Sequence, residues 1–396
     1  MSILDEAKKL KPYLVKIRRD IHSRPELGFE EYVTQAYIIK ELKKLRIPYK
    51  TMIKTGVVGL IKGKKPGKTI LLRADIDALP ILEENTCSYK SKNKGVMHAC
   101  GHDTHTAMVL GAARILAARK NEMAGNIKLV FQPREEFAES EYDPAEEMVR
   151  LGVMRNPKVD MCAALHADPS IPAGKVKVIH GPVMANADKF NIRILGVGAH
   201  GSEPQNARDA VYASAAVIQG LQSVVSRNVA PIHSAVVSVT MVHGGTAMNV
   251  IPPEVKLGGT IRTLNDRVYK LVKNSMRRVV EKTCESLGLK GEIDFIKCYP
   301  AFANDERAAA LFERSAAKLI GERNLVKGGT SSMAGENFAY FARKAPSVFC
   351  WLGVSKGKGQ YPIHHPRFDI DENALVVGAA VLAGFAADNT GSAEGK

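Results

Sequence analysis

The stretch Met97-His98-Ala99-Cys100-Gly101-His102-Asp103-Thr104-His105 holds one thiol, three imidazole rings and one carboxylate in nine residues. Thiols and imidazoles are common ligands of transition metals, and a glycine between them lets the chain turn. The apolar run 106–118 predicts a helix directly after the stretch. A polar loop that enters a helix is a usual place for chemistry. Alone, the pattern is more typical of a buried thiol beside a hydrogen-bonded histidine than of a metal site, so its meaning depends on partners elsewhere.

The composition is that of an ordinary globular protein: of 396 residues, 45% are hydrophobic and 24% are charged. No apolar run is long enough to cross a bilayer, and no secretory signal is visible, so we expect a cytoplasmic protein that binds no membrane. The six cysteines form no CxxC pair, which favours reduced thiols. The basic residues behind the net charge of +15 are dispersed along the chain, and their densest cluster has no aromatic residues interleaved with it. We therefore expect no nucleic-acid partner.

Apolar strands alternate with helices in the first and last parts of the chain. We expect strands at 56–62, 69–73, 127–131, 160–165 and 347–353, and helices at 3–23, 30–45, 106–118, 144–152, 304–320, 335–343 and 372–387. This alternation is the signature of an α/β fold. The basic segment 62–68 is expected to form a hairpin turn between two strands.

The middle of the chain has a different order. Its predicted elements are strands 188–196, 234–242, 254–262 and 291–298, and helices 208–226 and 266–287. The order β-α-β-β-α-β is the ferredoxin-like arrangement. We therefore expect an inserted α+β domain, residues 186–299, between two parts of one catalytic domain, residues 1–185 and 300–396.

Polar side chains lie at the carboxyl ends of the predicted strands, where sites form in open α/β sheets. They are Asp75, Asp77, Glu135, Glu136 and His166, with Cys100, His102 and His364 in neighbouring loops. Singly, each fits an exposed turn, a strand cap or a core histidine. Together they offer the N, O and S ligands that suit zinc. Of two adjacent glutamates, one can bind metal while the other acts as a general base.

Six motifs resemble the bacterial and plant amidohydrolases of metallopeptidase family twenty, which include hippurate hydrolase, N-acyl-amino-acid amidohydrolases and auxin-conjugate hydrolases. The motifs are HSRPELGFEE (22–31), RADIDALP (73–80), MHACGHD (97–103), FQPREE (131–136), HGGTAMNVIP (243–252) and HHPRFD (364–369). They occur in the family's order over nearly the whole chain. The resemblance implies an α/β/α metallopeptidase catalytic domain with an inserted ferredoxin-like lid and dimerisation domain.

The resemblance also implies a site for two divalent metal ions. Zinc is the expected metal, and manganese, cobalt or nickel are alternatives. The implied ligands are Cys100, His102, Glu136, His166 and His364, with the Cys100 thiolate as a candidate bridge. His364 is preferred to His365 because the family has one histidine two positions before the proline. Asp75 and Asp77 would support the ligands, and Asp103 would orient its neighbours or cap the helix. His98 and His105 are expected to be structural.

The implied reaction is hydrolysis of the amide of an N-acyl amino acid or short peptide with a free carboxylate, by metal-bound water. Glu135 would be the general base, and His200 would stabilise the oxyanion in its own or a partner's site. Asn249 and Arg262 would bind the substrate, and the chain would form a homodimer. Arg134, Asp168 and Asn337 replace the family's usual residues, which leaves the preferred acyl group and amino acid open.

Two alternatives remain at this point. The first is a thiol hydrolase with Cys100 as the nucleophile and His102 as the base, in which the glutamates have no role. The second is a catalytically silent protein that binds amino-acid conjugates or an acidic partner.

Overall fold

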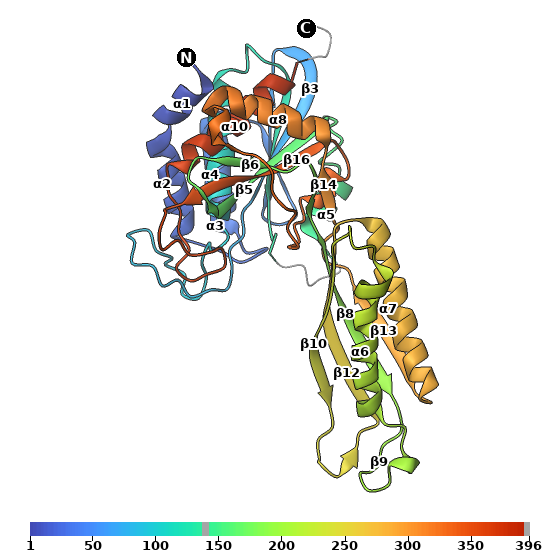
Figure 1. Cartoon of the computed structure of the whole chain (residues 1–396). Coiled ribbons are helices and arrows are strands. Elements are labelled where there is room, and N and C mark those ends of the chain that lie inside the picture. The colour runs from blue at the N-terminus through green and yellow to red at the C-terminus, as the bar shows by residue number, and fades with distance from the viewer. Residues whose placement is uncertain (137–141, 392–396) are drawn as a thin grey trace.

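The computed structural model describes residues 1–136 and 142–391 and has two lobes (Figure 1). The first lobe is built on an eight-stranded mixed sheet in the order β1-β2-β4-β3-β5-β16-β6-β15. Its strands are β1 (Tyr49–Met52), β2 (Gly56–Lys62), β3 (Lys65–Asp75), β4 (Ala124–Gln132), β5 (Met161–Pro172), β6 (Val176–Val178), β15 (Leu325–Val326) and β16 (Ser347–Ser355). A short sheet of β7 (Gly181–Met184) and β14 (Phe302–Asn304) adjoins it.

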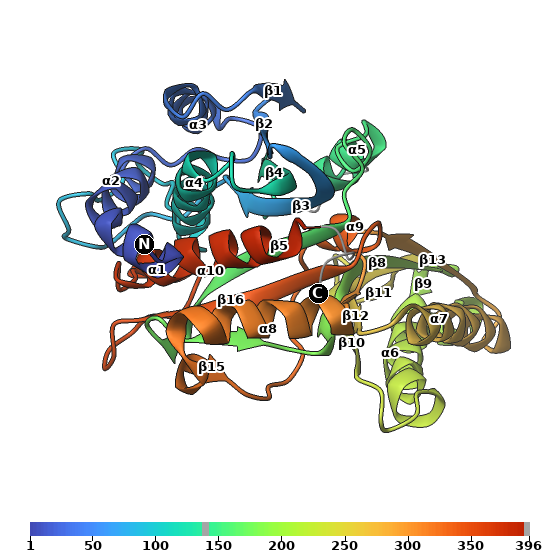
Figure 2. The same ribbon diagram turned by 90° about the horizontal axis from the view of Figure 1, so that it is seen from above.

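Helices cover both faces of this sheet (Figure 2). One face carries α1 (Ile3–Lys9), α2 (Lys11–His22), α3 (Tyr32–Lys44), α4 (His102–Ala118), α8 (Glu306–Ile320) and α10 (Ala374–Asn389), and the other carries α5 (Pro144–Arg150) and α9 (Ala339–Ala342). Alternate residues of one strand supply the two cores: Ile70 and Leu72 pack on the first face, and Leu71 on the second. The expected α/β fold with helices on both faces of a central sheet is confirmed.

The second lobe is a four-stranded sheet in the order β10-β12-β8-β13. Its elements are β8 (Asn186–Leu195), α6 (Ala210–Asn228), β10 (Ala235–Gly244), β12 (Glu254–Thr263), α7 (Asp266–Ser286) and β13 (Lys290–Ile296), with a 3₁₀ turn at Pro204–Asn206. The two helices pack on one face of the sheet over a core that includes Phe190 and Leu221. The ferredoxin-like order is confirmed, whereas the division at residues 186 and 299 stays a prediction.

Local predictions failed where distant segments decide the outcome. Segment 62–68 is not a hairpin between neighbouring strands, because β4 lies between β2 and β3 and pairs with both. Turn residues indicate a reversal but do not specify which strand pairs with which. Strand β5 continues to Pro172, so His166 lies inside a strand and not after its end.

Two predicted helices are shorter than expected. The helix over 3–23 is interrupted at Leu10, because Pro12 lies in the first turn of the next helix, where its missing N–H costs nothing. The helix over 335–343 is reduced to α9, because Glu336 is engaged in other contacts. Its carboxylate accepts the Phe338 N–H and forms a buried ion pair with Arg73. Among the described residues, no helix is long and apolar enough to cross a membrane.

A buried arginine joins the beginning and the end of the chain. The Arg18 guanidinium on α2 is fully buried and lies 2.9 Å from Asp103 on α4, 2.6 Å from Asp369 and 3.2 Å from Glu372. The last two carboxylates belong to the C-terminal part of the chain, so the network unites the two parts of the first lobe. Arg19 also pairs with Glu372, at 2.6 Å, but its side chain is 43% exposed.

This network predicts that Arg18→Met destabilises the protein far more than Arg19→Met. Removing one partner of a buried ion pair leaves uncompensated buried carboxylates and costs about 3–5 kcal/mol. An exposed pair contributes about 0–1 kcal/mol. Urea unfolding of both variants at neutral pH measures the difference, and equal losses of unfolding free energy would contradict this account.

Candidate functional site

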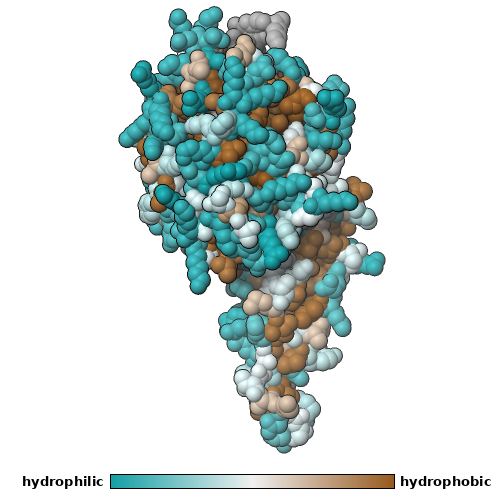
Figure 3. All heavy atoms as spheres, turned by 90° about the vertical axis from the view of Figure 1, so that its left-hand side faces the viewer, coloured by the Kyte–Doolittle hydropathy of each residue, from teal (hydrophilic) through white to brown (hydrophobic). Residues whose placement is uncertain are grey.

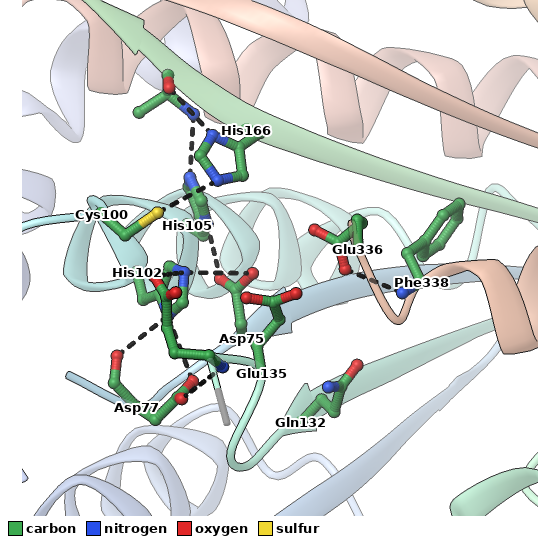
Figure 4. A network of polar contacts seen from close by, with 12 residues as sticks. Asp75, Asp77, Cys100, His102, His105, Gln132, Glu135, His166, Glu336 and Phe338 are labelled. Atoms are coloured by element: carbon green, nitrogen blue, oxygen red, sulfur yellow. Dashed lines mark hydrogen bonds and ion pairs between the residues drawn. The ribbon is translucent and has the colours of Figure 1, made fainter. Parts of the chain in front are cut away.

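The opening stretch turns sharply at Gly101 before α4 begins. Gly101 is in the left-handed region with φ 91°, and a Cβ there would lie 3.1 Å from the Ala167 Cβ on β5. A glycine therefore lets the turn approach β5 closely. The approach places the Cys100 thiol 3.4 Å from Nε2 of His166. Both side chains face the same buried space (Figure 4).

His102, the first residue of α4, is held with one ring nitrogen free. Its Nδ1 lies 2.9 Å from the Asp77 carbonyl and 3.2 Å from the Asp77 carboxylate. Its Nε2 is buried and has no hydrogen-bond partner among the described residues. That nitrogen lies 3.6 Å from Asp75 and 3.9 Å from Glu136. A carboxylate that holds one imidazole nitrogen and leaves the other free is the usual support of a metal-binding histidine.

Glu136 and His364 reach the same space from two loops. His364 Nε2 lies 3.1 Å from Glu136 Oε1, and the His364 N–H donates to the Ala99 carbonyl at 2.8 Å. The Glu136 N–H donates to the Asp77 carboxylate at 3.0 Å, so Asp77 supports both His102 and Glu136. The neighbouring His365 instead stacks on Tyr361, with ring centroids 4.3 Å apart.

All five predicted ligand residues therefore converge. Of the four groups in the described residues whose ligand atoms lie within 4.8 Å of one another, two consist only of these five residues: Cys100, His102 and His166, and Cys100, Glu136 and His364. Cys100 belongs to both groups. The donor set of one thiol, three imidazoles and a carboxylate is one that zinc and similar divalent metals accept.

Glu135 lies beside this cluster and is only 7% exposed. Burial, followed by the nearby Glu336 and Glu136 carboxylates, raises the pKa of Glu135 well above its ordinary value. A carboxylate with a raised pKa is suited to take up a proton near neutral pH.

Arg73 and Glu336 organise the site but were not among the predicted site residues, and His105, expected to be structural, supports the site as well. The Arg73 guanidinium is buried at the end of β3 and binds Asp75 at 2.6 Å and Glu336 at 2.9 Å. His105 bridges β3 to β5, because its Nδ1 lies 2.5 Å from Asp75 while its Nε2 accepts the Ala167 N–H at 2.9 Å. An arginine that ends an apolar strand was the one available signal for Arg73. Burial by itself raises the pKa of Asp75, but the positive charge of Arg73 holds that pKa well below its usual range.

The other predicted site residues do not join the cluster. Asp103 faces the opposite way, toward Arg18 and His22 at 2.9 and 2.8 Å, and it does not cap α4, whose N-cap is Gly101. His200 lies in β9 (Ala199–His200), at the end of the second lobe farthest from the first (Figure 1). β9 pairs with β11 (Val250–Ile251), and the Asn249 carbonyl accepts the Gly201 N–H at 2.8 Å.

Arg262 is the second-lobe residue nearest to the first lobe among those predicted. It lies near the end of β12, paired in register with Ala187 at the start of β8. The side chain is half-buried, and no ion pair or hydrogen bond of its guanidinium is found in the part of the chain that the structure describes. Its charge is therefore available to an anion.

The three residues that depart from the family's usual pattern each make local contacts. Arg134 has φ 50°, and its guanidinium lies over the Phe29 ring, 5.0 Å from the centroid. Asp168 pairs with Lys177 at 3.2 Å. Asn337 accepts hydrogen bonds from Arg73 at 3.0 Å and from Gln132 at 2.7 Å.

Comparison with known proteins covers both lobes. A family model described as peptidase family M20/M25/M40 matches residues 71–388. The thermostable carboxypeptidase 2 of Saccharolobus solfataricus is 37% identical over 387 residues, which are 96% of each chain. The N-acetylcysteine deacetylase of Bacillus subtilis is 39% identical over 375 residues, 94% of this chain and 96% of that protein. A solved Bacillus subtilis structure, described as a dinuclear metal binding peptidase from the M20 family, matches with TM-score 0.84 and 35% identity over 96% of this chain and 98% of the other.

Proposed function

The chain belongs to the peptidase family M20/M25/M40, and on that premise we propose that it hydrolyses N-acyl amino acids or short peptides with a free carboxylate. It is a metal-dependent hydrolase of amide bonds, a class supported by relatives named as a carboxypeptidase, a deacetylase and a dinuclear metal binding peptidase. The substrate class is proposed from Arg262, a half-buried arginine without an ion pair among the described residues, at the end of the second lobe that adjoins the first lobe with its buried cluster of candidate metal ligands.

The donor set fits a pair of divalent ions. His102 Nε2 is buried without a hydrogen-bond partner in the described residues, as expected of an atom that binds a cation, and Glu136 Oε1 lies 3.1 Å from His364 Nε2. We propose that Cys100, His102 and His166 face one ion and that Cys100, Glu136 and His364 face the other, with zinc as the metal. When bound, the ions would polarise the amide carbonyl and lower the pKa of a water molecule.

Within this site, Glu135 acts as the general base. It takes a proton from water at its carboxylate and returns that proton to the leaving amine nitrogen. Cys100 belongs to both groups of proposed metal ligands, and a thiolate that binds metal is not free to act as the nucleophile. This argues against the thiol hydrolase and for hydrolysis by water.

We predict that Glu135→Gln lowers kcat by about 10²–10⁴-fold, the usual contribution of a general base. Because Glu135 is not among the proposed ligands, the variant should keep two metal ions per chain. Glu136→Gln is the matched variant and should lose metal. Turnover of N-acetyl amino acids and metal analysis by mass spectrometry measure both effects.

Wild-type turnover by the metal-replete Glu135→Gln variant would show that the general base lies elsewhere. Activity that survives a chelator but is lost on thiol alkylation would favour Cys100 as the nucleophile.

Arg262 is proposed to bind the substrate carboxylate. A planar guanidinium binds a carboxylate through two parallel hydrogen bonds. The residue lies where the second lobe meets the first, and it keeps its charge free of protein partners among the described residues.

We predict that Arg262→Met raises KM for N-acetyl amino acids by about 10–100-fold, the equivalent of a lost charge-assisted hydrogen bond. KM for the corresponding amino-acid amides, which lack the carboxylate, should not change. Arg193→Met is a suitable control, since Arg193 lies on the same sheet and pairs with Glu254 at 2.7 Å. An equal rise in KM for acids and amides would exclude carboxylate binding by Arg262.

We propose that the second lobe, residues 186–299, is a lid that also forms a homodimer. β10 is an edge strand of its sheet, and exposed apolar side chains lie on β10 and α6. These side chains are Met241 and Val242 on β10, and Val211 and Tyr212 on α6. A strip of apolar surface runs along this lobe in Figure 3. Such a surface favours association with a second copy.

In this dimer, His200 and Asn249 would reach the partner's site, where His200 would stabilise the oxyanion. The remote position of His200 in its own chain supports this assignment over a role in its own site. The six free thiols support a cytoplasmic location.

Mixing the two inactive variants Glu135→Gln and His200→Ala tests the dimer and the role of His200 together. A mixed dimer contains one site with an intact Glu135 and an intact partner His200. After subunit exchange we expect about a quarter of wild-type activity. If a dimer is found by sedimentation but mixing restores no activity, His200 does not act in the partner's site.

A further inference from the structure

Three side chains hold the main chain of residues 134–136 from three directions. The Glu31 carboxylate accepts the Arg134 N–H at 2.9 Å, and Asp77 accepts the Glu136 N–H at 3.0 Å. The Tyr299 hydroxyl donates to the Glu135 carbonyl at 2.5 Å. Since the carbonyl of Glu135 and the N–H of Glu136 belong to one peptide group, Asp77 and Tyr299 hold that group from its two ends.

Tyr299 differs from the other two because it lies where the chain returns from the second lobe to the first. β13 ends at Ile296 in the second lobe, and β14 begins at Phe302 in the first. The Tyr299 carbonyl accepts the Ala187 N–H at 3.0 Å, which ties it to the outgoing crossing at β8. One residue therefore contacts both crossings with its main chain and the Glu135 peptide with its side chain.

The ring of Tyr299 packs closely against Gly335 in the loop before α9. A Cβ on Gly335 would lie 2.3 Å from Cδ2 of Tyr299 and 2.7 Å from the Ala187 Cβ. Such distances are well below van der Waals contact, so only a glycine fits here without displacing the ring. A shift of the lobe junction would therefore shift the Tyr299 ring, and the hydroxyl would move with the ring.

We propose that Tyr299 is a positioning residue that couples the placement of the second lobe to the main chain of Glu135. The proposal rests on the proposed role of Glu135 as the base. A change at the lobe junction moves the Tyr299 hydroxyl, and the hydrogen bond transmits that movement to the peptide between the base and Glu136. The position of the second lobe and the position of the Glu135 main chain therefore change together.

Tyr299→Phe removes the hydroxyl and keeps the ring. We expect kcat to fall about tenfold, because small misplacements of a catalytic group are costly, while KM stays within twofold. Amide hydrogen exchange in the full-length protein should become several-fold faster in the peptide that contains residues 131–136. Tyr13→Phe is the matched control, since it removes a tyrosine hydrogen bond, 2.9 Å to Glu41, between α2 and α3. It should change neither readout.

Gly335→Ala displaces the Tyr299 ring without removing its hydroxyl. If the hydroxyl carries the coupling, Gly335→Ala should lower kcat in the wild-type background and add little in the Tyr299→Phe background. Such non-additivity in a double-mutant cycle identifies residues that act through one contact. Additive losses would mean that Gly335→Ala acts independently of the hydroxyl and would overturn the coupling. Thermal unfolding of each variant reports any general loss of stability.

The outcomes separate this proposal from the proposed function. If Glu135→Gln is inactive but Tyr299→Phe keeps the wild-type kcat and exchange rate, Tyr299 has no positioning role and the function stands. If the wild type hydrolyses no substrate, the function fails, and the exchange of residues 131–136 still decides whether Tyr299 holds their main chain.

Discussion

The buried guanidinium of Arg73 is the interaction on which the site depends. It lies between Asp75 and Glu336, at 2.6 and 2.9 Å, and close to Glu135, in a space from which water is largely excluded. Without a positive charge there, three carboxylates would face one another at low dielectric, and burial would favour their protonation. The guanidinium thus allows Asp75 to stay anionic near Glu135, whose pKa is raised.

From Asp75 a series of contacts leads to the cluster of candidate metal ligands. His105 carries the contact from Asp75 to the main chain of Ala167, next to His166. Asp77, two residues farther along, holds His102 and the N–H of Glu136. Two acidic residues at the end of one strand therefore position side chains from a helix, a strand and a loop. Such supporting contacts set the orientation of ligands and the nitrogen that each imidazole presents.

The two lobes hold different candidate groups for the chemistry. The first lobe holds the candidate metal ligands and the proposed base, and the second holds Arg262, which has no ion pair in the described residues, at the junction and His200 at its far end. This division makes the junction important, because the relative placement of the lobes decides which groups meet the substrate. Tyr299 lies at that junction, and its hydroxyl donates to the main-chain carbonyl of Glu135, the proposed base.

The sequence by itself determined the class of fold and the identity of the clustered residues. The alternation of apolar segments specifies strands and helices locally, and residues such as Cys100, Glu136 and His364 are recognisable from motifs. Only the tertiary structure decided that β4 separates β2 from β3, that Asp103 turns away from the cluster, and that Arg73 and His105 support it. The physical reason is that strand order and buried charge pairing depend on contacts between segments far apart in the chain, whereas periodicity reports only on neighbours.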